Sequence, residues 1–158
     1  MPTRPADGEM APHIALRSHH GETVELAAAA GQRVLLMFYP FAFSRVCGSE
    51  LREVHRRWEE FRQVGARVLA ISCDSVHTLR AYADELSGSA EQLGPELLSD
   101  FWPHGAAAQA YGVFNPVTGG PQRVSFLLDE TLRVRHQIAS VNNEPRSLDQ
   151  TLSLLNSL

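Results

Sequence analysis

The sequence has no lysine and only two cysteines among its 158 residues. All 14 basic residues are therefore arginines, and with 18 acidic residues the formal net charge is −4. This balance argues against a nucleic-acid-binding protein, because such proteins carry a basic face that neutralises phosphates. Two cysteines are too few for a disulfide scaffold in a chain of this length. We therefore expect reduced thiols and a cytoplasmic protein.

Long apolar runs are also absent. No stretch approaches the roughly 20 apolar residues that a membrane-spanning helix needs. The N-terminal stretch "MPTRPADGEMAP" lacks the apolar segment of a signal peptide. We expect neither a membrane nor a nucleic acid as partner. The length fits one domain, which we place at residues 11–158 after a flexible N-terminal segment, residues 1–10.

What the sequence does contain is an alternation of strand-like and helix-like patterns. Strands are predicted by alternating or unbroken apolar residues at 13–18, 22–26, 33–40, 66–75, 96–100 and twice within 123–139, around a turn at Asp129–Glu130. Helical spacing or helix-ending glycines predict a short turn at 25–31 and helices over 44–65, 77–87, 102–112 and 144–158. In the third of these helices, Pro103 is expected to open the helix and Gly112 to close it.

This order predicts an α/β protein with a central mixed sheet covered by helices on both faces. The first two strands would form a small hairpin, the strands that alternate with helices would be mostly parallel, and the late hairpin would add antiparallel strands at one side. The pattern alone leaves several α/β folds open. Together with the motif described below, it favours a thioredoxin-like fold.

Cys47 occupies a notable position, because it follows the apolar strand 33–40 and falls in the first turn of the next helix. Functional sites in open α/β folds lie beyond the carboxyl ends of the strands. The free amides and the dipole of a helix start favour an anion, and a thiolate is one. The alternative is a buried structural cysteine, since free cysteine often packs as a small apolar residue.

A reactive thiolate at Cys47 would need more stabilisation than the helix start provides. Making the thiolate dominant over an ordinary thiol at neutral pH requires a pKa shift of roughly two units, or about 2.7 kcal/mol. A helix N-terminus supplies about 0.3–2 kcal/mol. The site would therefore need a further cation or hydroxyl donor. Ser44, three residues upstream, and an arginine from elsewhere in the chain are the candidates.

The residues around Cys47 form a recognisable pattern. Pro40, Ser44 and Cys47 give P-x-x-x-S-x-x-C, with Glu50 three residues later. This resembles the peroxiredoxin motif P-x-x-x-T-x-x-C. The runs 97–115 ("LLSDFWPHGAAAQAYGVFN"), 123–129 ("RVSFLLD") and 70–75 ("AISCDS") are similar to the one-cysteine peroxiredoxins of the alkyl hydroperoxide reductase E (AhpE) type found in actinobacteria. The resemblance covers roughly residues 11–155.

The resemblance implies a thiol-dependent peroxidase without a cofactor or metal. Cys47 would be the nucleophile that a peroxide oxidises to a sulfenic acid. Arg123 would supply the second cation, and Ser44 would direct its hydroxyl at the peroxide oxygens and the sulfur. Pro40 would shield the pocket, and the amides of Val46 and Cys47 would hold the attacked oxygen.

Supporting residues are implied less directly. Glu50 either orients Arg123 or is an exposed first-turn carboxylate that stabilises the helix dipole. Phe41, Phe43, Phe101 and Trp102 either belong to the core or line the pocket or a dimer interface, and similar peroxiredoxins pair through the loops around the active site. We therefore expect a homodimer.

Two departures from the family pattern affect details. Ser44 replaces the usual threonine, which keeps the hydroxyl but loses the methyl group that stiffens the rotamer. We expect activity to persist with this change. The stretch "APHI" at 11–14 replaces A-P-D-F, which we interpret as a packing difference in the first strand.

Cys73 ends a predicted strand, where it either packs as a structural residue or resolves the oxidised Cys47 through a disulfide. We favour the structural role, because the family's resolving cysteines lie elsewhere. Reduction then requires an external thiol, for which mycothiol with a mycoredoxin, or thioredoxin, is the expected donor. The preferred substrate among hydrogen peroxide, organic hydroperoxides and peroxynitrite is left open.

Two other functions remain alternatives. Dithiol–disulfide exchange uses the same helix start but needs C-x-x-C, whereas this chain has Glu50 at the fourth position. A regulatory or pathway-dedicated protein on the same scaffold is the other alternative, against which the joint presence of Ser44, Cys47 and Arg123 argues. A metal site at His19 and His20 is not favoured, because neighbouring strand residues point to opposite faces. His104 is expected to pack at a helix start.

Overall fold

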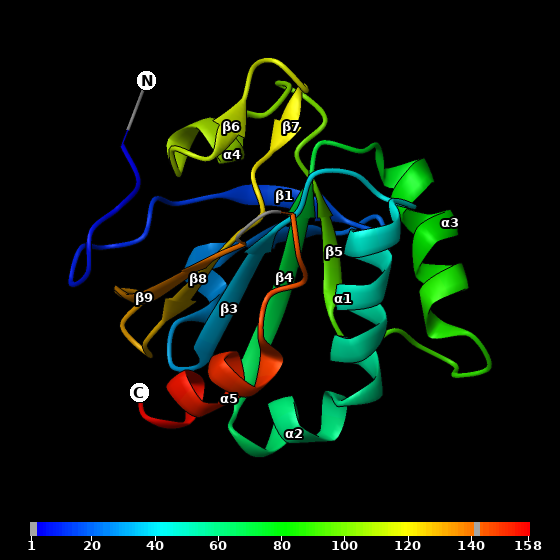
Figure 1. Ribbon diagram of the computed structural model, residues 1–158. Coiled ribbons are helices and arrows are strands. Elements are labelled where there is room, and N and C mark those ends of the chain that lie inside the picture. Colours follow the sequence, from blue (N-terminus) through cyan, green and yellow to red (C-terminus); the bar gives the residue numbers. More distant parts are fainter. Residues whose placement is uncertain (1–2, 141–142) are drawn as a thin grey trace.

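The computed structural model describes residues 3–140 and 143–158. Its main sheet has, within the described residues, seven strands in the order β2-β1-β5-β4-β3-β8-β9 (Figure 1). The central strands β3, β4 and β5 are parallel, whereas β1 and β8 join them antiparallel and carry β2 and β9 at the edges. The sheet is therefore mixed, as predicted. The strands are β1 (Ala15–Ser18), β2 (Thr23–Glu25), β3 (Arg33–Phe38), β4 (Ala66–Ser72), β5 (Glu96–Ser99), β8 (Val124–Leu128) and β9 (Val134–Ala139).

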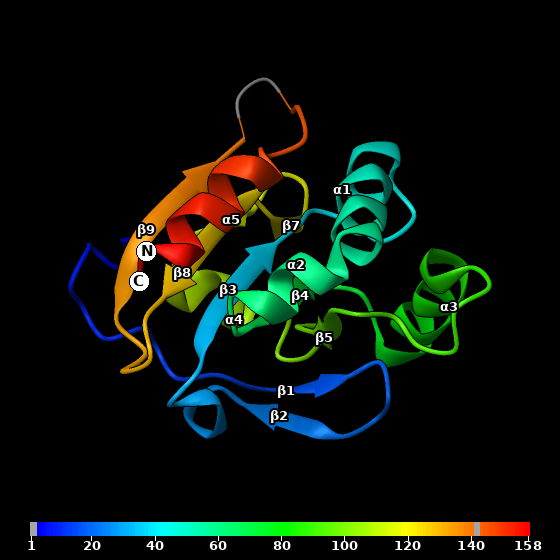
Figure 2. The same cartoon turned by 90° about the horizontal axis from the view of Figure 1, so that it is seen from below.

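Helices cover both faces of this sheet (Figure 2). Successive side chains of a strand point to opposite faces, so Leu35 and Met37 belong to one buried cluster and Leu36 and Phe38 to another. The first cluster is closed by α1 (Arg45–Arg56), α2 (Trp58–Gln63), α3 (Val76–Ser87) and α5 (Leu148–Asn156). The second is closed by the shorter α4 (Ala106–Ala110) and the 3₁₀-helix η1 (Leu26–Ala29). The predicted thioredoxin-like arrangement is confirmed.

The N-terminal segment, for which the sequence predicts flexibility, follows the outer edge of β9 in its described part. The Gly8 amide donates to the carbonyl of Val134 at 2.7 Å, and the Val134 amide donates to the carbonyl of Glu9 at 2.9 Å. The side chain of Gln137 donates to the carbonyl of Pro5 at 2.6 Å, and Pro5 is buried. These contacts hold residues 5–10 against the sheet.

The predicted helix over 44–65 is wrong in one respect, because it consists of two helices. Arg57 (φ −99°, ψ 24°) ends α1 and precedes α2. The change of direction places Trp58 directly against Gly94, where an added Cβ would lie 2.4 Å from the indole ring. Both helices bury their apolar residues in the same cluster, so the apolar spacing continues unbroken across Arg57. The sequence pattern therefore could not reveal the break.

The predicted helix over 102–112 is also shorter than expected. Residues 101–105 form turns that include a cis peptide bond between Trp102 and Pro103, and α4 begins only at Ala106. The buried carboxylate of Asp100 accepts hydrogen bonds from the amides of Ala107 and Ala108 at 2.9 Å each. Asp100 thus satisfies amides that a helix start leaves without partners.

Three smaller features complete the chain. The last helix begins at Leu148 rather than at residue 144, because Ser147 caps it by accepting from the Gln150 amide at 3.2 Å. A two-stranded sheet of β6 (Phe114–Asn115) and β7 (Gly120–Pro121) lies above the main sheet in Figure 1 and was not predicted. None of the helices within 3–140 and 143–158 is both long and apolar enough to cross a membrane.

Candidate active site

Cys47 lies at the third position of α1, at the end of the sheet where β3, β4 and β5 finish (Figure 1). Ser44 is the N-cap residue of this helix, and its Oγ accepts a hydrogen bond from the Cys47 amide at 3.3 Å. The predicted boundary between strand and helix is confirmed. The amide of Cys47 is thus already bonded to Ser44, while the Val46 amide makes no hydrogen bond to the described residues.

The loop between β3 and α1 is held by two contacts. The Ala42 amide donates to Oδ2 of Asp74 at 2.8 Å, which ties the loop to the end of β4. Phe43 adopts a left-handed backbone (φ 65°), which is uncommon for a bulky residue. Its ring packs on Tyr82 of α3 with centroids 4.8 Å apart. Phe43 therefore supports the loop from the α3 side.

Arg123, just before β8, reaches both the sulfur and a carboxylate. Its Nη1 lies 3.3 Å from the Sγ of Cys47 and 2.6 Å from Oε1 of Glu50. Its Nε is buried and has no hydrogen-bond partner among the described residues. The side chain that contacts the sulfur thus retains one unused buried donor.

Glu50 is 3% exposed, so the alternative of an exposed first-turn carboxylate is wrong. It lies between two arginines, Arg123 and Arg146. Arg146 was not among the predicted site residues. Its guanidinium donates to both Glu50 oxygens at 2.8 and 2.9 Å, to the carbonyl of Phe38 at 2.8 Å and to Ser125 Oγ at 3.1 Å. Its backbone amide also donates to Glu50, at 2.7 Å.

The network shifts the titration of its members. Burial by itself would raise the pKa of Glu50, but the hydrogen bonds and charge of Arg146, followed by the charge of Arg123, hold that pKa below its usual value. Burial would lower the pKa of Arg123, whereas Cys47 and Glu50 together raise it above its ordinary value. The two arginines and one glutamate therefore form a buried cluster with one uncompensated positive charge, next to the thiol.

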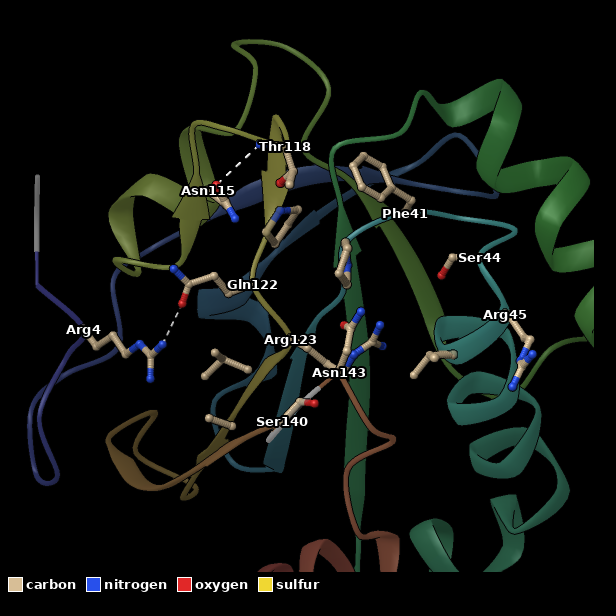
Figure 3. A pocket seen from close by; sticks show the side chains of 15 residues that line it. Arg4, Phe41, Ser44, Arg45, Asn115, Thr118, Gln122, Arg123, Ser140 and Asn143 are labelled. Carbon is tan, nitrogen blue, oxygen red and sulfur yellow. Dashed lines mark hydrogen bonds between the residues drawn. The ribbon is translucent and has the colours of Figure 1, made fainter.

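A cavity of about 680 Å³ opens beside this cluster (Figure 3). Five predicted site residues line it: Pro40, Phe41, Ser44, Val46 and Arg123. Cys47 itself is fully buried and lies immediately behind Ser44, Val46 and Arg123. Its sulfur therefore contacts Arg123, which lines the cavity, but is not itself part of the cavity wall.

Two predicted pocket residues lie elsewhere. Phe43 and Trp102 are not part of the cavity wall; Phe43 packs on Tyr82, and Trp102 is 83% exposed in the loop after β5. Nothing in the aromatic pattern of the sequence distinguishes these residues from Phe41, which does line the cavity.

Three further residues named in the sequence, Cys73, His19 and His104, have structural surroundings. Cys73 is buried and free at the end of β4, and burial, followed by the charges of Asp100 and Asp74, raises its pKa to about 12. His19 Nδ1 accepts from the Leu97 amide at 3.1 Å. His104 Nε2 lies 2.6 Å from the carbonyl of Gly119.

Comparison with known proteins places this geometry in a family. Residues 8–137 match the model described as the AhpC/TSA family. Over 129 residues the chain is 39% identical to alkyl hydroperoxide reductase E of Mycobacterium tuberculosis, a match that covers 81% of each chain. It is 34% identical over 140 residues to thioredoxin peroxidase of Fasciola hepatica, covering 86% of this chain and 70% of that one.

Solved structures agree on the fold. The crystal structure of AhpC from Enterococcus faecalis superimposes with a TM-score of 0.86 at 21% identity, covering 97% of this chain and 92% of that chain. The structure of peroxidoxin BcpB from Mycobacterium tuberculosis gives 0.85 at 24% identity, covering 98% and 99%. A buried thiol, a hydroxyl N-cap and a guanidinium thus meet beside a cavity. Together with the family match, this shows that the chain belongs to the AhpC/TSA family and is a peroxiredoxin, a thiol-dependent peroxidase.

Proposed function

We propose that Cys47 is the residue that reacts with the peroxide. The thiolate sulfur attacks one oxygen of the hydroperoxide, an S–O bond forms, and the O–O bond breaks. The electron pair of that bond goes to the leaving oxygen, which takes a proton and departs as water or an alcohol. Cys47 becomes a sulfenic acid, so the sulfur is oxidised by two electrons and the peroxide is reduced by two.

One observation carries this proposal: the Nη1 of Arg123 lies 3.3 Å from the Cys47 sulfur inside a cluster that has one positive charge too many. A thiolate supplies the missing negative charge, so that two arginines face two anions. In a buried site such compensation is worth far more than in water. Arg123 is therefore the additional cation that a thiolate needs, because the helix start alone does not stabilise it enough.

The other cavity residues act on the peroxide oxygens. The unused Nε of Arg123 and the Val46 amide are donors available to the oxygen on which charge develops. The Ser44 hydroxyl accepts from the Cys47 amide, so its proton remains free to be donated. Pro40 forms part of the wall that limits water at the sulfur.

We further propose that an external thiol reduces the sulfenic acid. Two thiols convert it back to the Cys47 thiol and leave as a disulfide, with one water released. Cys73 is unsuited to the task, because its pKa of about 12 keeps it protonated at neutral pH and only the thiolate is a good nucleophile. A mycothiol–mycoredoxin pair or a thioredoxin is the donor we expect. The two free cysteines fit a reducing compartment, and we infer the cytoplasm.

We also propose a homodimer formed through the loops at this end of the sheet. Large exposed apolar side chains concentrate there: Phe43 (52%), Phe101 (52%), Trp102 (83%) and Val117 (92%). Apolar side chains gathered on adjacent loops mark protein interfaces. Sedimentation equilibrium of the wild type and of Trp102→Ser tests this; a monomeric wild type would refute the dimer.

Stopped-flow oxidation of the reduced protein tests the peroxidase assignment. The fluorescence of Trp58 and Trp102 reports the reaction, and hydrogen peroxide is the substrate. The wild type is expected to react orders of magnitude faster than free cysteine. Cys47→Ser should consume no peroxide, whereas Cys73→Ser should react as the wild type does. A wild-type rate no greater than that of free cysteine, or full activity in Cys47→Ser, would overturn the proposal.

A further inference from the structure

Two tyrosine hydroxyls are buried beside the start of α1 without a hydrogen-bond partner among the described residues. Tyr39 directly follows β3, Tyr82 belongs to α3, and both side chains are fully buried. Both lie in the buried cluster that contains Cys47, and their ring centroids are 6.4 Å apart. A buried hydroxyl without a partner is unfavourable in a folded protein, because it has given up its hydrogen bonds to water. The peroxidase reaction proposed above uses neither hydroxyl.

Tyr82 supports the active-site turn on both sides of Cys47. Its ring packs on Phe43 with centroids 4.8 Å apart. A Cβ added to Gly48 would lie 3.8 Å from its hydroxyl oxygen. Because α3 packs beside α1 (Figure 1), one side chain reaches the residues that precede and follow the nucleophile.

Both phenol hydrogens are free to turn. Ser72 lies near the hydroxyl of Tyr39, and the Phe43 amide lies near that of Tyr82, in neither case with hydrogen-bond geometry. An amide can only donate to a phenol oxygen, so it leaves the phenol O–H available. Within residues 3–140 and 143–158, each phenol therefore keeps a donor that it can direct at a nearby anion.

Three charged groups besides the nucleophile face these phenols. Asp74, which follows β4, faces Tyr39 and already accepts from a loop amide at 2.8 Å. Arg52 and Glu85 face Tyr82 and pair with each other at 3.3 Å in solvent. Neither carboxylate accepts a hydrogen bond from a phenol. The charged neighbours thus leave both phenol donors unused.

An ionised Cys47 is the remaining anion that acts on both phenols. Burial, followed by the negative charge of Cys47, raises the pKa of Tyr82. Burial is also the main cause that raises the pKa of Tyr39, and Cys47 contributes to it. Both phenols are therefore protonated at neutral pH. The sulfur itself contacts Arg123, which is paired with Glu50.

We propose that the hydroxyls of Tyr39 and Tyr82 stabilise the Cys47 thiolate by turning their O–H dipoles toward the sulfur. The inference rests on the peroxidase function proposed above. The dipoles act from the core, at the end of β3 and on α3, whereas Arg123 acts from the cavity wall. In a buried site, a dipole directed at a charge stabilises it far more than in water.

The pH dependence of the peroxidase rate tests the inference. Stopped-flow rate constants for hydrogen peroxide are measured for the wild type and for the double variant Tyr39→Phe, Tyr82→Phe. Only the thiolate reacts, so the rate rises with pH to a plateau. Loss of both dipoles disfavours the thiolate, and the midpoint of this rise should move up by about 0.5–1 pH unit, the equivalent of one ordinary hydrogen bond. The plateau should stay within about twofold of the wild type.

Urea unfolding supplies a readout that separates this role from a structural one. The double variant should lose no stability, because the hydroxyls that it removes have no partner. Tyr111→Phe is the matched control: Tyr111 is buried on the other face of the sheet, and its hydroxyl donates to the Pro12 carbonyl at 2.6 Å. This control should lose stability and keep the wild-type midpoint.

Three results would overturn the inference. The first is an unshifted midpoint in the double variant, and the second is an equal loss of rate at every pH. The third is a loss of stability in the double variant as large as that of Tyr111→Phe. A wild type that does not reduce hydrogen peroxide would instead refute the peroxidase function itself.

Discussion

The Nη1 of Arg123 lies 3.3 Å from the sulfur of Cys47, although 76 positions separate the two residues in the chain. The register between β3 and β8 creates this contact, because Phe38 at the end of β3 pairs with Val124 at the start of β8. The residue before Val124 and the helix after β3 thus meet at one end of the sheet.

Replacing Arg123 with methionine should remove most of the peroxidase rate. Methionine keeps an unbranched chain but loses the charge and the donors beside the sulfur. Loss of one such donor typically lowers a rate by about 10²–10³-fold. Stopped-flow rate constants for hydrogen peroxide check this, with Arg62→Met as the exposed control and urea unfolding to verify the fold. A decrease smaller than about threefold would contradict the role of Arg123.

Replacing Glu50 with glutamine should destabilise the protein strongly at neutral pH. Two buried arginines would then face no carboxylate, a loss of about 3 kcal/mol in the free energy of unfolding. The matched control is Glu53→Gln on the same helix, where the carboxylate is paired with Arg56 in solvent and a small effect is expected.

The difference between wild type and Glu50→Gln should depend on pH. Because the pKa of Glu50 is lower in the folded protein than in the unfolded chain, the carboxylate stabilises the fold above the unfolded value of about 4.3. That contribution is lost as the pH falls through the folded-state pKa. Urea unfolding of both proteins from about pH 7 to pH 3 should therefore show their stabilities converging in acid. A constant difference would argue against this account.

Two substitutions at Ser44 separate the effect of the hydroxyl, which caps the helix, from the effect of the missing methyl group. Ser44→Ala removes the acceptor for the Cys47 amide and should lower the free energy of unfolding by about 1 kcal/mol, together with the peroxidase rate. Ser44→Thr retains the hydroxyl and stiffens it, so rate and stability should equal or exceed those of the wild type. A Thr variant slower than the Ala variant would count against the hydroxyl's role.

Cys73 should take no part in the redox cycle. At a pKa of about 12 it is almost entirely protonated at neutral pH. Mass spectrometry after one equivalent of peroxide should find one added oxygen on the protein and no loss of two hydrogens. An intramolecular disulfide between Cys47 and Cys73 would refute this prediction, as would impaired turnover of Cys73→Ala with an external thiol.

Much of this site was predictable from the sequence because its signals are local. Helix-capping chemistry at Ser44 and the change from strand to helical spacing place Cys47 at a helix start without reference to the rest of the chain. The order of strands and helices likewise predicts the mixed sheet, since parallel strands need helical crossovers.

Arg146 was not predictable, because nothing in "EPRSL" distinguishes it from an exposed arginine before a helix. Its burial depends on tertiary contacts with Phe38, Glu50 and Ser125, which come from three separate elements. The true start of α4 was missed for a related reason. Its amides are satisfied by Asp100, which precedes a turn, so the proline at 103 does not mark the first helical residue.

The surplus positive charge around Glu50 has a consequence for the second half of the reaction. If Cys47 is oxidised to a neutral sulfenic acid as proposed, Glu50 compensates only one of the two charges of Arg123 and Arg146, and the other is left unbalanced. The oxidised protein therefore presents an electrostatic field that attracts anions at the very atom that must be reduced. The attacking form of a reducing thiol is itself an anion. On the proposed mechanism, we therefore expect oxidation of Cys47 to favour the approach of an anionic reductant and its reduction to weaken that attraction.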